Sequence, residues 1–200
     1  MRSTTFNRRP LWCALALCLI GLSSQASAAG PNLVLNGSFE TGAFTNWTET
    51  GNNAFDGVQC PGAANVTNGS CDAYFGPLGA VGGITQSITT AVGSQYLITF
   101  DFLGDPGNTT STFQVGFGGA SLLSVINPFN SHFQSYSFTT TASAASSLLS
   151  FQFRDDLGFM ELDNVSVALA PVPEPATWLS LGLGIALLTL RRQRQQQAQS

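Results

Sequence analysis

The chain has 200 residues, of which 9% are charged, and its formal net charge is −4. Ten of its eleven acids lie between Glu40 and Asp163, where Arg154 is the only basic residue, so this middle part carries a net charge of about −9. A surface of that sign repels phosphate backbones and argues against binding to nucleic acid.

The N-terminus has the three parts of a secretory signal peptide. Arg8 and Arg9 precede an apolar run over residues 11–22, and small residues at 26–28 suit a cleavage site. We therefore expect a signal peptide over residues 1–29, which would take the chain through the Sec translocon.

The four cysteines fall into two groups. Cys13 and Cys18 leave with the leader, so the mature chain keeps Cys60 and Cys71 in an oxidising compartment, where pairing is the rule. No histidine or further cysteine stands at ligand spacing, which makes metal binding the weaker alternative. We expect a disulfide between Cys60 and Cys71.

Residues 30–170 are expected to form one folded domain. This part is rich in Gly, Ser, Thr, Asn and Phe, and apolar residues alternate with polar ones over 96–102, 113–117 and 149–153. Short, evenly spaced strands with Gly and Asn turns predict an antiparallel sandwich or barrel. The alternation places most of the fifteen Phe residues in its core.

Two segments at the ends of this domain suggest its family. The opening segment, residues 32–42, reads NLVLNGSFETG and is followed by Trp47, and the closing segment, residues 162–167, reads LDNVSV. Together they resemble the two ends of galactose-binding-like jelly rolls, a group that includes several carbohydrate-binding modules. The resemblance implies an all-β fold, an antiparallel jelly-roll β-sandwich of eight or more strands in two sheets.

The closing segment also predicts a β-bulge. Its apolar alternation shifts by one residue at Asp163-Asn164, and a bulge there would re-aim Asp163 and leave backbone carbonyls unpaired. Such oxygens suit Ca²⁺. In the resembling modules a structural calcium joins the first and last strands, and the matching positions here are Glu40 and Asp163. The alternative is that Asp163 caps its own turn through backbone N–H groups.

Residues 152–156 read Gln-Phe-Arg-Asp-Asp. They resemble the Gln-Phe-x-x-Asp motif of one subfamily of proteins with a PEP-CTERM tail, with Asp156 as the terminal acid. Alternation directs Phe153 to the core and leaves both aspartates at the end of the strand. We expect a structural corner in which a nearby acid neutralises Arg154, in preference to a ligand site.

The C-terminal part, residues 171–200, has a proline motif, an apolar segment over 176–190 and a basic end. The residues concerned are Pro173, Glu174 and Pro175, then Arg191, Arg192 and Arg194. The order resembles the PEP-CTERM sorting signal, which implies cleavage by an exosortase-type enzyme. From the prolines alone, a stiff extended linker is the alternative.

The apolar segment is short for a membrane anchor. Its thirteen residues from Trp178 to Leu190 span about 20 Å as a helix, against roughly 30 Å of hydrocarbon. We therefore expect a transient hold in the inner membrane, with the arginines on the cytoplasmic side. A GPI-type signal also has a spacer and a removable apolar end, but the basic end argues against it.

Three functions are compatible with this organisation. The first is a non-catalytic protein of the cell surface or of an extracellular polysaccharide (biofilm) matrix that contacts glycans, and the second is a dedicated lectin-like module. The matrix component requires no dedicated site, whereas a lectin would use loop aromatics, for which Trp47, Phe55 and Tyr74 are the candidates because they lie beside Gly, Asn or Asp. The alternative for each of them is a place in the core or at its rim. A glycan-active enzyme ranks last.

The chemistry for catalysis is sparse. His132 is the only histidine, and no nucleophile or phosphate-binding motif occurs. A glycosidase needs only two facing carboxylates, so a pair formed by Asp101 or Glu161 with another acid is the one open route. We expect no enzymatic activity and no cofactor other than a structural Ca²⁺.

Overall fold

The structure, a computed structural model, describes residues 29–62, 66–104 and 111–171, together with isolated residues between 182 and 195. The chain divides into two compact units, of which one comprises Ser27–Pro175 and the other the two chain ends. The predicted signal peptide and the motif Pro173-Glu174-Pro175 lie outside the described residues. The described part of the chain contains no helix with the length and hydropathy that a membrane span needs.

The first unit contains ten described strands. They are β1 (Thr48–Gly51), β2 (Gly57–Gln59), β3 (Asp72–Phe75), β4 (Gly82–Thr89), β5 (Gln95–Leu103), β6 (Ser111–Phe117), β7 (Ala120–Ile126), β8 (Gln134–Thr141), β9 (Ser146–Asp155) and β10 (Met160–Leu169).

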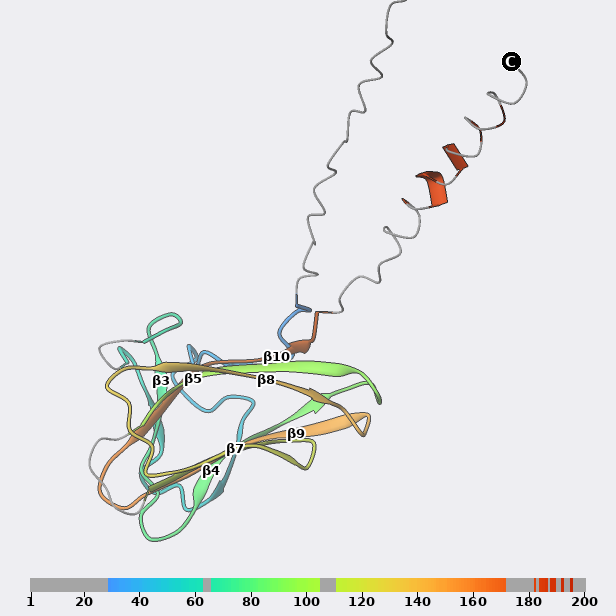
Figure 1. Ribbon diagram of the computed structural model, residues 1–200. Coiled ribbons are helices and arrows are strands. Elements are labelled where there is room, and N and C mark those ends of the chain that lie inside the picture. The colour runs from blue at the N-terminus through green and yellow to red at the C-terminus, as the bar shows by residue number, and fades with distance from the viewer. Residues whose placement is uncertain are drawn as a thin grey trace, which may run out of the picture. The chain divides into compact units, whose positions relative to one another are not determined.

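The strands form two five-stranded sheets. One has the order β1-β4-β9-β6-β7 and the other β2-β3-β10-β5-β8. All neighbouring strands pair antiparallel. The two sheets lie as separate layers, with β5, β8 and β10 in one and β4, β7 and β9 in the other (Figure 1). This confirms the predicted antiparallel sandwich.

Phenylalanine rings from the two sheets fill the space between the layers. The ring of Phe102 on β5 stacks on that of Phe113 on β6 with a centroid distance of 3.8 Å, and Phe75 on β3 stacks on Phe153 on β9 at 3.9 Å. All four side chains are fully buried. Each such ring contributes about 1.5–3 kcal/mol of hydrophobic stabilisation, so packing accounts for these aromatics as the alternation predicted.

The predicted bulge is present on β10. Asp163 pairs with Asp101, and the next paired residue, Ser166, faces Thr99, so β10 has one residue more than β5 over this stretch. Asn164 within the bulge has a positive φ of 53°, a conformation that Asn tolerates better than most residues. The bulge therefore explains the one-residue shift of the apolar alternation.

The sandwich has two distinct ends. At one end the chain enters and leaves: Gly30 N donates to Leu169 O, and Ala170 N donates to Gln95 O. The other end, which we call the distal end, carries the loops 52–56, 76–81, 127–133 and 156–159. The ten residues of β10 separate the two ends, which corresponds to about 33 Å at the usual rise of a strand.

Candidate functional site

Of the three aromatic candidates for glycan contact, Trp47 takes the alternative position in the core. Its side chain is 7% exposed, its ring stacks on Phe39 with a centroid distance of 5.9 Å, and its Nε1 donates to Asn36 O at 3.1 Å. An indole with a satisfied N–H inside an aromatic cluster is a core residue. The polar residues before it in the sequence belong to the turn that precedes β1, and they do not determine whether the indole points to the core or to solvent.

Tyr74 does lie at the surface, and it has a partner that the sequence analysis missed. Its ring meets the ring of Phe159 edge-on, with a centroid distance of 5.6 Å and an interplanar angle of 80°. Phe159, directly before β10, is 51% exposed. We call these two residues the aromatic corner. Met160 and Leu162 face the core, so the alternation of the strand predicts that Phe159, one residue before Met160, faces solvent.

Glycines make room for the aromatic corner. A Cβ on Gly57 would collide with the Tyr74 side chain, and a Cβ on Gly76 would lie 2.7 Å from the ring of Phe159. Both rings therefore occupy space that a larger residue at either position would fill. The corner thus depends on three separate segments of the chain.

Phe55 lies in the loop next to the aromatic corner and is 52% exposed. The loop is held against β3 because Gly76 N donates to Asp56 Oδ1 at 3.2 Å. Burial raises the pKa of Asp56 to about 6. The bond from Gly76 N lowers this pKa and the nearby charge of Glu49 raises it, each by less than burial does. Phe55 is therefore an accessible aromatic on a fixed loop.

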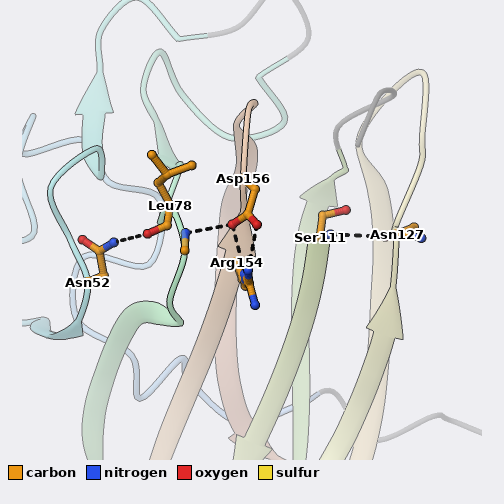
Figure 2. Close-up of polar contacts among 7 residues, drawn as sticks. Asn52, Leu78, Ser111, Asn127, Arg154 and Asp156 are labelled. Atoms are coloured by element: carbon orange, nitrogen blue, oxygen red, sulfur yellow. Dashed lines mark hydrogen bonds and ion pairs between the residues drawn. The ribbon is translucent and has the colours of Figure 1, made fainter. Parts of the chain in front are cut away.

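Hydrogen bonds fasten the other distal loops to one another (Figure 2). Asn52 Nδ2 donates to Leu78 O at 2.8 Å, and Gly79 N donates to Asp156 Oδ1 at the same distance. Ser111 N, at the start of β6, donates to Asn127 Oδ1 at 3.2 Å and so fastens the loop that follows β7. Loops held in this way present their side chains from a rigid scaffold, which is the usual setting of a binding site.

The Gln-Phe-x-x-Asp segment forms part of this fastening. Arg154 donates from Nε and Nη2 to the two oxygens of Asp156 at 3.0 and 2.7 Å. The hydrogen bonds from the Arg154 guanidinium lower the pKa of Asp156, and the bond from Gly79 N lowers it further by a smaller amount. Phe153 is buried. The predicted structural corner with a neutralised Arg154 is confirmed.

A cluster of polar side chains lies on the same sheet face as Tyr74. Glu161 pairs with Tyr74 across β10 and β3, Asp72 stands two residues before Tyr74, and Gln59 Nε2 donates to Asp72 Oδ2 at 3.1 Å. The pKa of Glu161 is raised to about 7, first by burial and then by the charge of Asp72, to which its side chain is hydrogen-bonded. The carboxyl group of Glu161 therefore keeps its proton to a higher pH than a free glutamic acid side chain does.

Asp101, the other acid considered for catalysis, is engaged on both oxygens. Ser135 Oγ donates to its Oδ1, and Asn164 Nδ2 donates to its Oδ2 at 3.0 Å. These bonds tie β8 and the bulge of β10 to β5. The structure does not bring Asp101 into the cluster of Glu161 and Asp72.

The disulfide loop covers the predicted calcium residues. Cys60 and Cys71 are joined by a disulfide. Beside it, Glu40 Oε1 accepts from Ser70 N and Cys71 N, both at 2.8 Å. Asp163 lies under the same loop, and burial raises its pKa although the bonds that it accepts oppose the shift. The loop is thus fastened to both carboxylates.

The groups that face Asp163 are donors. Its Oδ2 accepts from Thr67 N, Thr67 Oγ1 and Asn68 N at 2.8–3.0 Å, and its Oδ1 accepts from Asn164 N at 2.6 Å. A calcium ion needs oxygen ligands in these places, so this arrangement matches the alternative of a capped turn. Among the described residues no three His, Cys, Asp or Glu side chains stand together as a metal group. The calcium site stays a prediction.

Comparison with known proteins bears on both parts of the chain. Residues 171–194 match the model of the PEP-CTERM protein-sorting motif, which includes Pro173, Glu174 and Pro175 and the three C-terminal arginines. This confirms the resemblance of the tail. No curated protein sequence matches the chain.

The sandwich is similar to solved carbohydrate-binding modules. One is TmCBM61, determined in complex with β-1,4-galactotriose, with 15% identity, a TM-score of 0.58 and coverage of 69% of this chain and 98% of that one. Another is the CBM22-1 xylan-binding domain of Paenibacillus barcinonensis Xyn10C, with 17% identity, a TM-score of 0.51 and coverage of 74% and 99%. At these identities the likeness shows the fold, a jelly roll of the carbohydrate-binding-module type.

Proposed function

We propose that this chain is an exported protein of the cell surface or of an extracellular polysaccharide matrix, that an exosortase-type enzyme processes its tail at the inner membrane, and that its sandwich contacts glycans without catalysis. One juxtaposition carries the proposal: a jelly roll of the carbohydrate-binding-module type ends with β10 at Leu169, and the sorting motif begins at residue 171. The object that the tail sorts is therefore the sandwich itself.

The placement of the aromatic corner supports contact with material outside the cell. The chain leaves the sandwich beside Gln95, whereas Tyr74 and Phe159 lie at the distal end, about 33 Å away along β10. Attachment through the tail would thus leave the corner accessible to a polymer.

The chemistry of the corner suits a sugar. Aromatic rings pack against the apolar faces of sugar rings, while a few polar groups fix the hydroxyls. Tyr74, Phe159 and Phe55 supply the rings. Gln59 and Glu161, both half-buried, supply an amide and a carboxyl group on the same face as Tyr74, while Asp72 is fully buried beside them. The Glu161 carboxyl group, whose pKa is raised to about 7, can both donate and accept when it is protonated, as hydroxyl groups require.

The same acid pair supports a non-catalytic role. Glycosidases hold their two carboxyl groups roughly 5–9.5 Å apart, so that a sugar, with or without a water, fits between them. Asp72 is instead fully buried, and its charge is near enough to raise the pKa of Glu161, so a sugar does not reach a position between the two carboxyl groups.

A dedicated lectin is the alternative function, and the aromatic corner with its polar cluster is the observation that favours it. A lectin would bind one oligosaccharide with a defined stoichiometry. A matrix component would bind a long polymer weakly through many copies, so that its avidity depends on the density of the protein. Titration with oligosaccharides of increasing length distinguishes the two.

The test of glycan contact is the double variant Tyr74→Ala/Phe159→Ala, assayed by affinity electrophoresis in the host's own exopolysaccharide. We expect binding to weaken at least about tenfold, because both stacking surfaces are lost. Phe129→Ala is the control, since Phe129 is 64% exposed and lies outside the corner. Equal loss in the control, or unchanged binding in the double variant, would contradict the assignment of the corner.

A further inference from the structure

One side of the sandwich is built mainly from a stretch of chain that has no formally charged residue. Between Asp105 and Arg154 the sequence contains no Asp, Glu, Lys or Arg, and His132 is the only titratable residue with a basic side chain. This stretch forms β6, β7, β8 and most of β9. In a domain of net charge about −9, the absence of charge over four consecutive strands marks the side on which another acidic molecule meets least repulsion.

The two outermost strands of that side are β7 and β8. Each ends its sheet in the strand order, and the stacking of Phe102 on Phe113 places β5 over β6, so the neighbouring β8 and β7 lie on the same side of the sandwich. Figure 1 shows them in the two layers. Among the described strands, none pairs with the outer edge of either.

The two edges differ in how they are protected. The pairing of β7 with β6 shifts at Val115 and Gly116, and such a bulge twists an edge away from further pairing. By contrast, β8 pairs with β5 without interruption from Gln134 to Thr141. It contains no charge and no proline. An edge strand of this kind lacks the devices that normally prevent pairing with another chain.

Two aromatic side chains on the inner face of β8 are only partly covered. Tyr136 and Phe138 stack on Phe100 with centroid distances of 5.2 and 6.1 Å, yet both stay half-buried. Beside them lies a surface hollow of about 540 Å³, lined by Phe129, Asn130, Ser131, Gln134, Ser135 and Tyr136. A further strand along β8 would cover these rings and extend the core.

We infer that two copies of this protein associate through β8, which pairs antiparallel with β8 of the second copy and joins the two five-stranded sheets into one of ten strands. A two-fold arrangement is self-complementary, because each copy offers the same strand. The second copy suits the edge because it brings an equally uncharged strand. Any other protein would need an uncharged edge of its own.

The alternation of β8 fixes the register. Residues that face each other in an antiparallel pair point to the same face, so core-facing residues must meet core-facing residues. With Ser137 opposite Ser137 of the second copy, Tyr136 of each copy faces Phe138 of the other. The two half-buried rings of each copy thereby cover those of the other.

The register gives a charge test at one position. Ser137 is exposed and lies on the outer face, so Ser137→Lys would place two lysines opposite each other across the two-fold axis, as Ser137→Glu would place two glutamates. Each variant should dissociate, and the association constant should fall about tenfold or more. An equimolar mixture of the two variants should associate again as a mixed pair.

The experiment is sedimentation analysis of the protein as its host exports it, over a range of concentrations and at low and high salt. Thr48→Lys is the control, because Thr48 is exposed on the opposite edge, on β1. We expect the wild type and the control to form dimers that strengthen with salt, since screening weakens the repulsion between acidic domains. Three results would each overturn the inference: a monomeric wild type, dissociation of the control to the same extent as Ser137→Lys, or a mixture of the two variants that stays monomeric.

Discussion

The raised pKa of Glu161 predicts a pH dependence of stability that one substitution removes. Folding raises the pKa of Glu161 from 4.5 to about 7. Between these values the unfolded chain releases the proton while the folded protein keeps it, so stability falls as the pH rises from 4.5 to 7, and the loss is complete above 7. Glu161→Gln cannot ionise, and its amide can donate to Asp72 as the protonated acid does.

The size of the effect follows from that shift. A difference of about 2.5 pKa values corresponds to roughly 3 kcal/mol, which we reduce to about 1–2 kcal/mol because the side chain is only half-buried and solvent screens part of it. The variant should therefore melt roughly 3–6 °C above the wild type at pH 8. At pH 4 the two should melt together.

Differential scanning fluorimetry at pH 4, 6 and 8 is sufficient to measure this difference. Glu49→Gln provides the matched control, because Glu49 is exposed on β1 and its neutralisation should change the melting temperature by at most about 1 °C. A gain by Glu161→Gln that is as large at pH 4 as at pH 8 would refute the reasoning. So would a loss at pH 8.

Three further predictions concern the core, the aromatic corner and the disulfide loop. Phe75→Ala should lower the free energy of unfolding by about 3–5 kcal/mol in urea titration, because it removes a fully buried ring stacked on Phe153. Gly76→Val should cost about 1–3 kcal/mol in the same assay, because its Cβ would lie 2.7 Å from the ring of Phe159. Asp163→Ala should cost about 1–3 kcal/mol in EGTA, because it leaves the N–H groups of Thr67 and Asn68 without their acceptor. A wild-type melting temperature that rises with calcium, with no rise in this variant, would support the predicted metal site.

The sequence was informative wherever a local period determined the structure. Alternation over Phe151 and Phe153 placed their rings in the core, and the one-residue shift at Asp163-Asn164 predicted the bulge that the register shows. The ends of the domain pointed to the jelly roll, and the similar solved structures have that fold. Each of these features depends on residues that are close together in the chain.

The features that the sequence did not reveal depend on pairing between distant segments. Tyr74 meets Phe159 only because β3 pairs with β10, and the same pairing brings Asp72 to Glu161. Trp47 stands alone between polar residues, where no alternation reveals that its indole turns inward. The side built mainly from the uncharged stretch became visible only when the strand order placed β7 and β8 together at the edges.

The central claim is that this chain is an exported protein whose sandwich reaches the outside through a processed tail, and intact mass spectrometry tests it most directly. The protein is recovered from the membrane and extracellular fractions of its own host, as the wild type and as Pro173→Ala/Glu174→Ala/Pro175→Ala. We predict that the extracellular wild type lacks the residues beyond the proline motif, while the variant stays in the membrane with its C-terminal arginines. If both forms are found outside the cell with Arg191, Arg192 and Arg194 intact, the claim is contradicted.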